Sequence, residues 1–315
     1  MIRSILVAVI SGLLAASVQA RTNISLAWPY SPAHGATPAM YALVEEANKL
    51  QDKYEFVFES KPGADGLIAI QHMNQSPSNR LSVIAAGFVD LVMQGKVVES
   101  NHTHLVGLGD MCFAVWMKNA NPTVGFESIK TQGEITIGNV AWGNASHLIA
   151  LIVAEKYNMK VRNIVFKSNR EALLNLAQDG GVTLVVDTPN AFDDFKLQAR
   201  VQAYPAAVTC GHRLLQWPNT KTLKEQGINA IAPWLIITSN KDMPTATQSE
   251  ISALLNQSLI NIGSNKIMEI SNLHPVVFHK NKNVNDFYNE RASQQKMLIT
   301  KFRPTIDADR GVAAK

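Results

Sequence analysis

The sequence is poor in cysteine, in charge and in the short motifs that mark catalytic sites. It has two cysteines and 17% charged residues among 315 positions, with a formal net charge of +4. The basic residues form no run and are not interleaved with aromatic residues, so we expect no nucleic-acid binding. No GxSxG, HExxH, Walker or GxGxxG pattern occurs, so the usual hydrolase, zincin and nucleotide-binding signatures are missing. We therefore expect no catalysis, no metal ion and no cofactor.

The first twenty residues have the pattern of a secretory leader. A basic start at Arg3 is followed by an apolar stretch, residues 5–16, that is too short to span a bilayer comfortably. Small residues end at Ala20, so we expect cleavage between Ala20 and Arg21. Because the residue after the cut is not a cysteine, no lipid anchor is expected. A membrane anchor is the alternative reading. These features predict an exported protein located in the periplasm.

Cys112 and Cys210 would meet an oxidising compartment after export. A disulfide between them would close a long loop, worth about 4–5 kcal/mol in the chain-entropy model. The sequence alone leaves this pairing open. Without CxxC spacing, the two cysteines give little support for metal or redox chemistry.

Strand-like and helix-like segments alternate along most of the chain. Such alternation predicts an α/β fold with mainly parallel sheets covered by helices. We expect two lobes, the first from residues 21–121 together with 231–315 and the second from residues 122–230, hinged around a ligand cleft. Among the later strands we include Val276–Phe278, which separates two long helical stretches at Gln248–Gly263 and Val284–Lys301.

Four loops that follow predicted strands have the composition of ligand-binding loops. In parallel α/β sheets, ligands meet the loops at the carboxyl ends of the strands, beside helix N-termini. The loops are residues 29–37, 61–66, 139–147 and 187–190. The alternatives are an ordinary strand-to-helix turn for the first loop and a helix cap, from Asn144 or Ser146, for the third.

Ser146, His147 and Asp187 are the residue types of a nucleophilic triad. Adjacent residues on a helix point about 100° apart, so a hydrogen bond between Ser146 and His147 is not expected. The pattern therefore does not favour an enzyme.

Several of these motifs resemble the periplasmic solute receptors of tripartite tricarboxylate transporters, the Bug or TctC-like family, over essentially the whole mature chain. Residues 31–37 (SPAHGAT) resemble a first loop of the Ala-Pro-Gly-Gly-Ala-Thr-Asp type, and residues 61–66 (KPGADG) resemble an Arg-Pro-Gly-Ala-Gly-Gly turn. The other matching residues are Ser146, His147, Leu148, Arg213, Pro218, Thr222, Glu225, Gly227, Trp234 and Pro244. The resemblance implies a two-lobed venus-flytrap receptor.

The resemblance also implies a set of ligand-binding residues in each lobe. Those implied are Tyr30, Ser31, His34, Gly35, Ala36 and Thr37 in the first lobe, and Trp142, Gly143, Asn144, Ser146, Ser168 and Asp187 in the second. The chain departs from the family pattern at Pro38, where an acidic residue is usual, and at His34, where glycine is usual. His34 would either add a positive charge at mildly acidic pH or face solvent. Trp142 would either stack on the ligand or pack beneath the loop.

The resemblance further implies the partners of such a receptor. It would be a monomer that captures a small carboxylate and presents it to the membrane permease subunits of a transporter. Two other functions stay open at this point. One is a ligand-sensing receptor of a two-component signalling system, which would share the fold and the pocket, and the other is an exported hydrolase.

Overall fold

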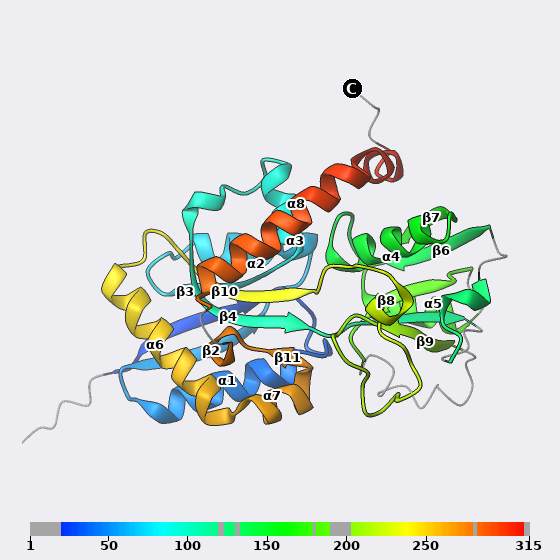
Figure 1. Ribbon diagram of the computed structural model, residues 1–315. Coiled ribbons are helices and arrows are strands. Elements are labelled where there is room, and N and C mark those ends of the chain that lie inside the picture. Colours follow the sequence, from blue (N-terminus) through cyan, green and yellow to red (C-terminus); the bar gives the residue numbers. More distant parts are fainter. Residues whose placement is uncertain are drawn as a thin grey trace, which may run out of the picture.

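The computed structural model describes residues 20–118, 123–129, 133–178, 181–189, 203–279 and 282–311. The expected leader lies outside these residues apart from Ala20, and so does Asn190 of the fourth predicted loop. The chain forms two separate β-sheets with helices packed on them (Figure 1). Among the described helices, none is long and apolar enough to cross a membrane.

The first sheet has six strands in the order β11-β4-β10-β3-β1-β2. β1 runs parallel to β2 and β3, whereas β10 is antiparallel to β3 and β4, and β11 is antiparallel to β4. The strands are β1 (Thr22–Trp28), β2 (Tyr54–Ser60), β3 (Arg80–Ala85), β4 (His102–Met111), β10 (Trp234–Asn240) and β11 (Leu273–His274). All seven residues of β10 are buried, as expected for a central strand covered on both faces.

The second sheet has five strands in the order β7-β6-β8-β5-β9. β6 runs parallel to β7 and β8, and β5 is antiparallel to β8 and β9. The strands are β5 (Ala114–Lys118), β6 (Glu134–Asn139), β7 (Lys160–Val165), β8 (Leu184–Asp187) and β9 (Ala203–Val208). Both sheets are therefore mixed, which corrects the expectation of mainly parallel sheets, although the α/β class is confirmed.

Helices cover both faces of the first sheet, with α1, α6 and α7 on one side and α2, α3 and α8 on the other (Figure 1). We call this sheet and its helices lobe 1, and we call the second sheet with α4 and α5 lobe 2. The helices are α1 (Thr37–Leu50), α2 (Leu67–Asn74), α3 (Gly87–Met93), α4 (Ala145–Lys156), α5 (Asn169–Ala177), α6 (Thr245–Ile262), α7 (Ser264–Ser271) and α8 (Val284–Asp309). Every residue of α4 from Ala145 to Ala154 is buried, because the helix lies between the second sheet and α8.

The chain passes between the lobes in more than one place. It leaves the first sheet after Met111 and enters the second at Ala114, earlier than the predicted boundary at residue 121. It returns between β9 and β10, and α8 then contacts both α3 of lobe 1 and α4 of lobe 2. Cys112 and Cys210 form a disulfide beside these passages, with their Cα atoms 4.8 Å apart.

The main local difference from the sequence prediction is in the last third of the chain. Val276–Phe278 is a short 3-10 helix rather than a strand, and the preceding residues Leu273–His274 pair with β4 instead. Pro275 lies between the two segments and has no amide to donate to a β-ladder. Two helices were not predicted, α3 and α7, because each is short and follows another element closely.

Candidate functional site

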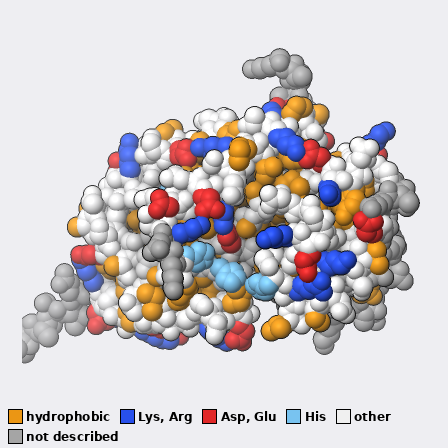
Figure 2. Space-filling view, viewed as in Figure 1, with side chains coloured by type: hydrophobic (Ala, Val, Ile, Leu, Met, Phe, Trp, Pro, Cys, Tyr) orange, Lys and Arg blue, Asp and Glu red, His pale blue; other side chains and the backbone are white. Residues whose placement is uncertain are grey.

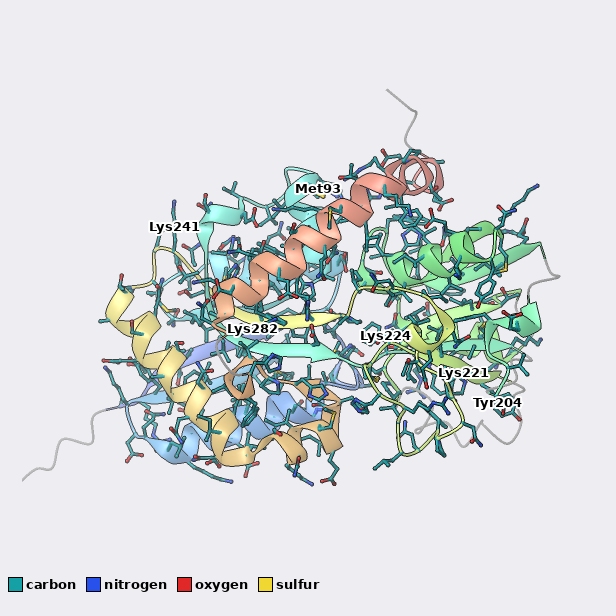
Figure 3. The ribbon with its side chains drawn as sticks, in the orientation of Figure 1. Met93, Tyr204, Lys221, Lys224, Lys241 and Lys282 are labelled. Atoms are coloured by element: carbon teal, nitrogen blue, oxygen red, sulfur yellow. A yellow bond between two sulfur atoms is a disulfide. The ribbon has the colours of Figure 1, made fainter. Side chains whose placement is uncertain are left out.

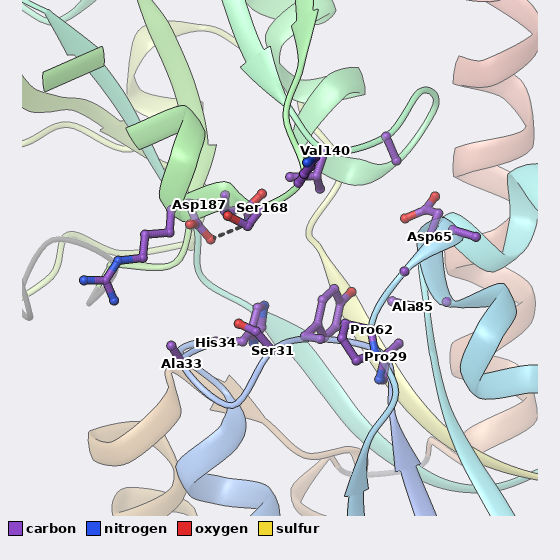
Figure 4. Close-up of a pocket in the computed structure, with 18 of the residues that line it drawn as sticks. Pro29, Ser31, Ala33, His34, Pro62, Asp65, Ala85, Val140, Ser168 and Asp187 are labelled. Carbon is purple, nitrogen blue, oxygen red and sulfur yellow. Dashed lines mark hydrogen bonds between the residues drawn. The ribbon is translucent and has the colours of Figure 1, made fainter. Parts of the chain in front are cut away.

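A cavity of about 640 Å³ lies between the two lobes. The parallel strands β1, β2 and β3 end at one edge of the first sheet, and β6, β7 and β8 end at one edge of the second. Loops that follow β1, β2, β6, β7 and β8 line the cavity, together with the end of β3 (Figure 4). This is the placement expected for a ligand site in an α/β fold.

The loop after β1 contributes Tyr30, Ser31, Ala33 and His34 to the cavity. The His34 ring stacks on Tyr30, with centroids 4.2 Å apart and planes 11° apart. The Ala36 amide donates to Nδ1 of His34 at 3.2 Å, which fixes the ring orientation. His34 therefore lies in the cavity rather than in open solvent, and burial lowers its pKa to about 3. A positive charge on His34 at mildly acidic pH is not expected.

Hydrogen bonds within the same loop pair several of its backbone groups. The His34 amide donates to Ser31, and the Thr37 amide donates to His34. Gly35, Ala36 and Thr37 are buried at the start of α1 and do not line the cavity. The amides of Ser31 and Ala33 have no acceptor within the described chain, so they stay available to a ligand.

The N-terminus of α5 forms the facing part of the cavity in lobe 2. Ser168 is the N-cap, and its hydroxyl accepts from the Glu171 amide at 3.2 Å. Lys167 and Arg170 are its neighbours in sequence and also belong to the cavity wall. Because the first amides of a helix lack intrahelical acceptors and carry the positive end of the dipole, this end of α5 is suited to an anion.

Asp187 ends β8 and is buried in the cavity wall. Its Oδ1 accepts from the Asn169 side chain at 3.0 Å and from the Thr188 amide at 2.7 Å. Burial raises the pKa of Asp187 to about 6, although those hydrogen bonds oppose the shift.

In lobe 2, four residues that the resemblance implied as ligand-binding do not line the cavity, namely Trp142, Gly143, Asn144 and Ser146. Asn144 caps α4, its Oδ1 accepting from the His147 amide at 2.9 Å. Trp142 packs edge-on against His147 and the hydrophobic core, the second of its two predicted roles. Ser146 is buried on α4. Asn144 is therefore the helix cap, while Val140 and Ala141 of the same loop line the cavity.

The neighbouring His147 is also away from the cavity. Its ring is fully buried, and Nδ1 accepts from the Gly143 amide at 3.0 Å. Burial lowers the pKa of His147 to about 3. Asp187 lines the cavity but neither Ser146 nor His147 does, so these three residues do not form a catalytic triad.

Sequence reasoning missed several residues of the cavity wall. Phe88 lies on the unpredicted helix α3, and Phe166 lies at the end of β7. Asn169 and Arg170 are brought in by the N-terminus of α5. Asp65 belongs to the predicted loop 61–66 but is not among the ligand-binding residues that the resemblance implies. A carboxylate at the carboxyl end of a parallel strand was the signal that could have indicated it.

Charges elsewhere on the surface are mixed. Figure 2 shows acidic and basic side chains interspersed over the visible face, with no continuous basic patch among the described residues. Lysines such as Lys221, Lys224, Lys241 and Lys282 project separately from the two lobes (Figure 3). Within the described ranges, no group of three His, Cys, Asp or Glu residues is arranged to hold a metal ion.

No protein-family model and no curated protein matches the chain. Solved structures do match over nearly its whole length. The periplasmic binding protein BugD has a TM-score of 0.73 at 18% identity, covering 90% of this chain and 97% of BugD. MatC from Rhodopseudomonas palustris, with bound malate, has a TM-score of 0.69 at 14% identity, covering 91% and 99%.

A third match is the R. palustris protein Rpa4515 with adipate, with a TM-score of 0.71 at 17% identity, covering 92% of this chain and 97% of that protein. At such identities the similarity concerns the fold. The resemblance seen in the sequence motifs is thus confirmed at the level of fold, and the chain has the two-lobed α/β architecture of the periplasmic solute-binding proteins of the Bug type.

Proposed function

We propose that the chain is a periplasmic solute-binding protein that captures a small carboxylate for a transporter of the tripartite tricarboxylate type. It would act as a monomer after loss of residues 1–20 and would present its ligand to the membrane permease subunits. The malate and adipate in two of the similar structures are small carboxylates, which supports this class of ligand.

The observation that carries the proposal is the pair of facing donor sets in one cavity. Lobe 2 offers the N-terminus of α5 with Ser168, Lys167 and Arg170 beside it. Lobe 1 offers the amides of Ser31 and Ala33. A volume of about 640 Å³ is within the range of small-molecule sites.

Binding would proceed by closure of the lobes on the solute. A carboxylate held first by one donor set would gain the second set only when the lobes approach, so the closed state binds it more tightly. No step of this mechanism makes or breaks a covalent bond, and the receptor would release the solute unchanged.

The test is a thermal-shift screen of the mature protein against mono- and dicarboxylates, followed by calorimetry. A ligand that binds only the folded state must raise the melting temperature. Ala33 is exposed in the cavity, so Ala33→Trp should fill the cavity and abolish binding while the protein stays folded.

Ala246→Trp is the matched control, because Ala246 is exposed on α6 and does not line the cavity. It should bind like the wild type. If no acid shifts the melting temperature, or if Ala33→Trp binds as well as Ala246→Trp, the proposal is wrong.

A further inference from the structure

Residues 63–66 form a turn of unusual backbone conformation in the cavity wall. Gly63, Ala64, Asp65 and Gly66 all have positive φ angles, of 122°, 46°, 55° and 94°. Glycine adopts this region freely, whereas alanine and aspartate do so at a cost in free energy. Strained non-glycine residues of this kind gather at functional sites. The conformation brings the Asp65 side chain into the cavity.

The Asp65 carboxylate lies against the first residue of α3. A Cβ atom on Gly87 would overlap the Asp65 side chain, so the glycine makes room for it. Within the described chain, the Asp65 carboxylate has no hydrogen-bond or ion-pair partner. Figure 4 shows Asp65 and Asp187 on opposite sides of the cavity. Asp65 is therefore a carboxylate that lines a ligand cavity and is left unpaired by the protein.

The surroundings of Asp65 supply no uncompensated positive charge to its carboxylate. Asp90 of α3 repels a charge on Asp65, and Arg310 at the end of α8 attracts it. Arg310 already contacts Asp90 at 2.5 Å, so its charge is largely compensated. Burial, together with the Asp90 charge, raises the pKa of Asp65 to about 7.

The loop after β1 adds no positive charge on this side. Burial of His34 keeps its ring neutral. Burial raises the pKa of Tyr30, and the fields of Asp65 and Asp187 add to the shift. The cationic side chains of the cavity wall, Lys167 and Arg170, belong to lobe 2 at the N-terminus of α5.

We propose that Asp65 is a specificity-determining residue that selects a solute carrying an amino group. The solute would be a zwitterion, with its carboxylate at the N-terminus of α5 and its ammonium group at Asp65. The inference rests on the proposed receptor function and narrows its ligand class. A dicarboxylate of the same length would place its second carboxylate against an unpaired acid, which costs binding free energy.

The same arrangement gives a pH dependence of opposite sign for the two ligand classes. Asp65 loses charge as the pH falls from 7.5 to 5.5, so its attraction for an ammonium group, and with it the affinity for an amino-group ligand, should fall. The affinity for a dicarboxylate should rise over that interval, because repulsion from Asp65 decreases. The charged or titratable groups that interact electrostatically with Asp65 are Asp90, Arg310 and Tyr30. The other titratable side chains of the cavity wall are His34, Asp187, Lys167 and Arg170.

The experiment compares straight-chain dicarboxylates of three to six carbons with ω-amino acids of equal length, together with aspartate and glutamate. Calorimetry with the mature protein at pH 7.5 should show at least one amino acid binding tenfold or more tightly than the dicarboxylate of the same length. Asp65→Asn should weaken the binding of that amino acid at least tenfold and reduce the preference for it over the dicarboxylate of the same length. Asp65→Gly should do the same while raising the melting temperature, because glycine relieves the left-handed conformation.

Asp242→Asn is the control, since Asp242 is exposed and away from the cavity. Tighter binding of the dicarboxylate by the wild type, or an unchanged preference in Asp65→Asn, would overturn the role of Asp65 and leave the receptor function standing. Binding of neither series would overturn both.

Discussion

Asp65 and His34 lie in the same cavity, and burial shifts their pKa values in opposite directions. Burial raises the pKa of the Asp65 carboxyl to about 7 and lowers the pKa of the His34 ring to about 3. In both cases the uncharged form is favoured, because a charged group loses its hydration when it enters a protein wall. Near pH 6.5 neither residue carries a full charge. In the part of the cavity wall that lobe 1 forms, the charge therefore changes with pH mainly through Asp65.

The raised pKa of Asp65 predicts a pH-dependent effect of Asp65→Asn on stability. The unfolded carboxyl ionises at the ordinary value of about 3.9, whereas the folded one keeps its proton up to about pH 7. The stability that the proton gives is therefore present at low pH and lost as the pH rises through 7. Asp65→Asn should raise the free energy of unfolding by about 1 kcal/mol at pH 8, after allowing for the exposure of the group.

Urea unfolding of the two proteins at pH 5 and pH 8 would measure this difference. The gain should be smaller at pH 5, where much of the wild-type carboxyl is protonated in the folded state. An equal gain at both pH values would show that relief of backbone strain, and not ionisation, is responsible.

At the scale of elements, α8 holds the two lobes together. The buried side chain of Gln295 donates to the Ala86 carbonyl of lobe 1 at 2.5 Å and to the Gly143 carbonyl of lobe 2 at 3.3 Å. Arg310 contacts the Asp90 carboxylate at 2.5 Å and the Trp142 carbonyl at 3.3 Å. The carbonyl groups of Gly143 and Trp142 therefore accept hydrogen bonds that join α8 to lobe 2, which explains their place outside the cavity.

Removing the Arg310 side chain should lower the free energy of unfolding. The Asp90 side chain is only 3% exposed, and its other cation, Arg303, is 3.8 Å away. Arg310→Ala would leave a buried carboxylate poorly compensated, so we expect a loss of about 2–4 kcal/mol in the free energy of unfolding. Adding Asp90→Asn should recover part of that loss.

Lys301→Ala on the same helix is the matched control, since its ion pair with Glu155 is half exposed and should be worth less than about 1 kcal/mol. Denaturant unfolding measures all four proteins. Equal losses for Arg310→Ala and Lys301→Ala would contradict the role given to Arg310.

The elements themselves were largely predictable, and the cavity wall only in part. Periodicity gave most strands and helices, because their buried faces repeat at the spacing of the element. Asp187 could be found because it ends a buried strand, whereas Ser168 was implied by the resemblance alone. Asn144 could not be separated from a ligand-binding residue by sequence, because a helix cap and an anion site use the same side chains. Phe88 depends on α3, whose apolar residues continue directly from β3.

At the scale of the whole molecule, the disulfide joins two segments that connect the lobes. Cys112 lies between β4 and β5, and Cys210 follows β9, with a sequence separation of 98 residues. Replacing both cysteines by alanine should lower the free energy of unfolding by about 4–5 kcal/mol in the chain-entropy model. Denaturant unfolding without a reductant measures the loss, and the reduced wild type should behave similarly. A loss below about 1 kcal/mol would show that the bond does not restrain the unfolded chain.

The place of β10 in the first sheet limits the order in which the chain can fold. β10 separates β3 from β4, although it follows β4 by more than a hundred residues of sequence and all five strands of the second sheet lie between them. While the polypeptide grows from its amino terminus, β4 has no neighbour to pair with until β10 arrives. Lobe 2, whose strands are contiguous in sequence, can assemble first. The lobe that begins at the amino terminus is thus the last to be completed.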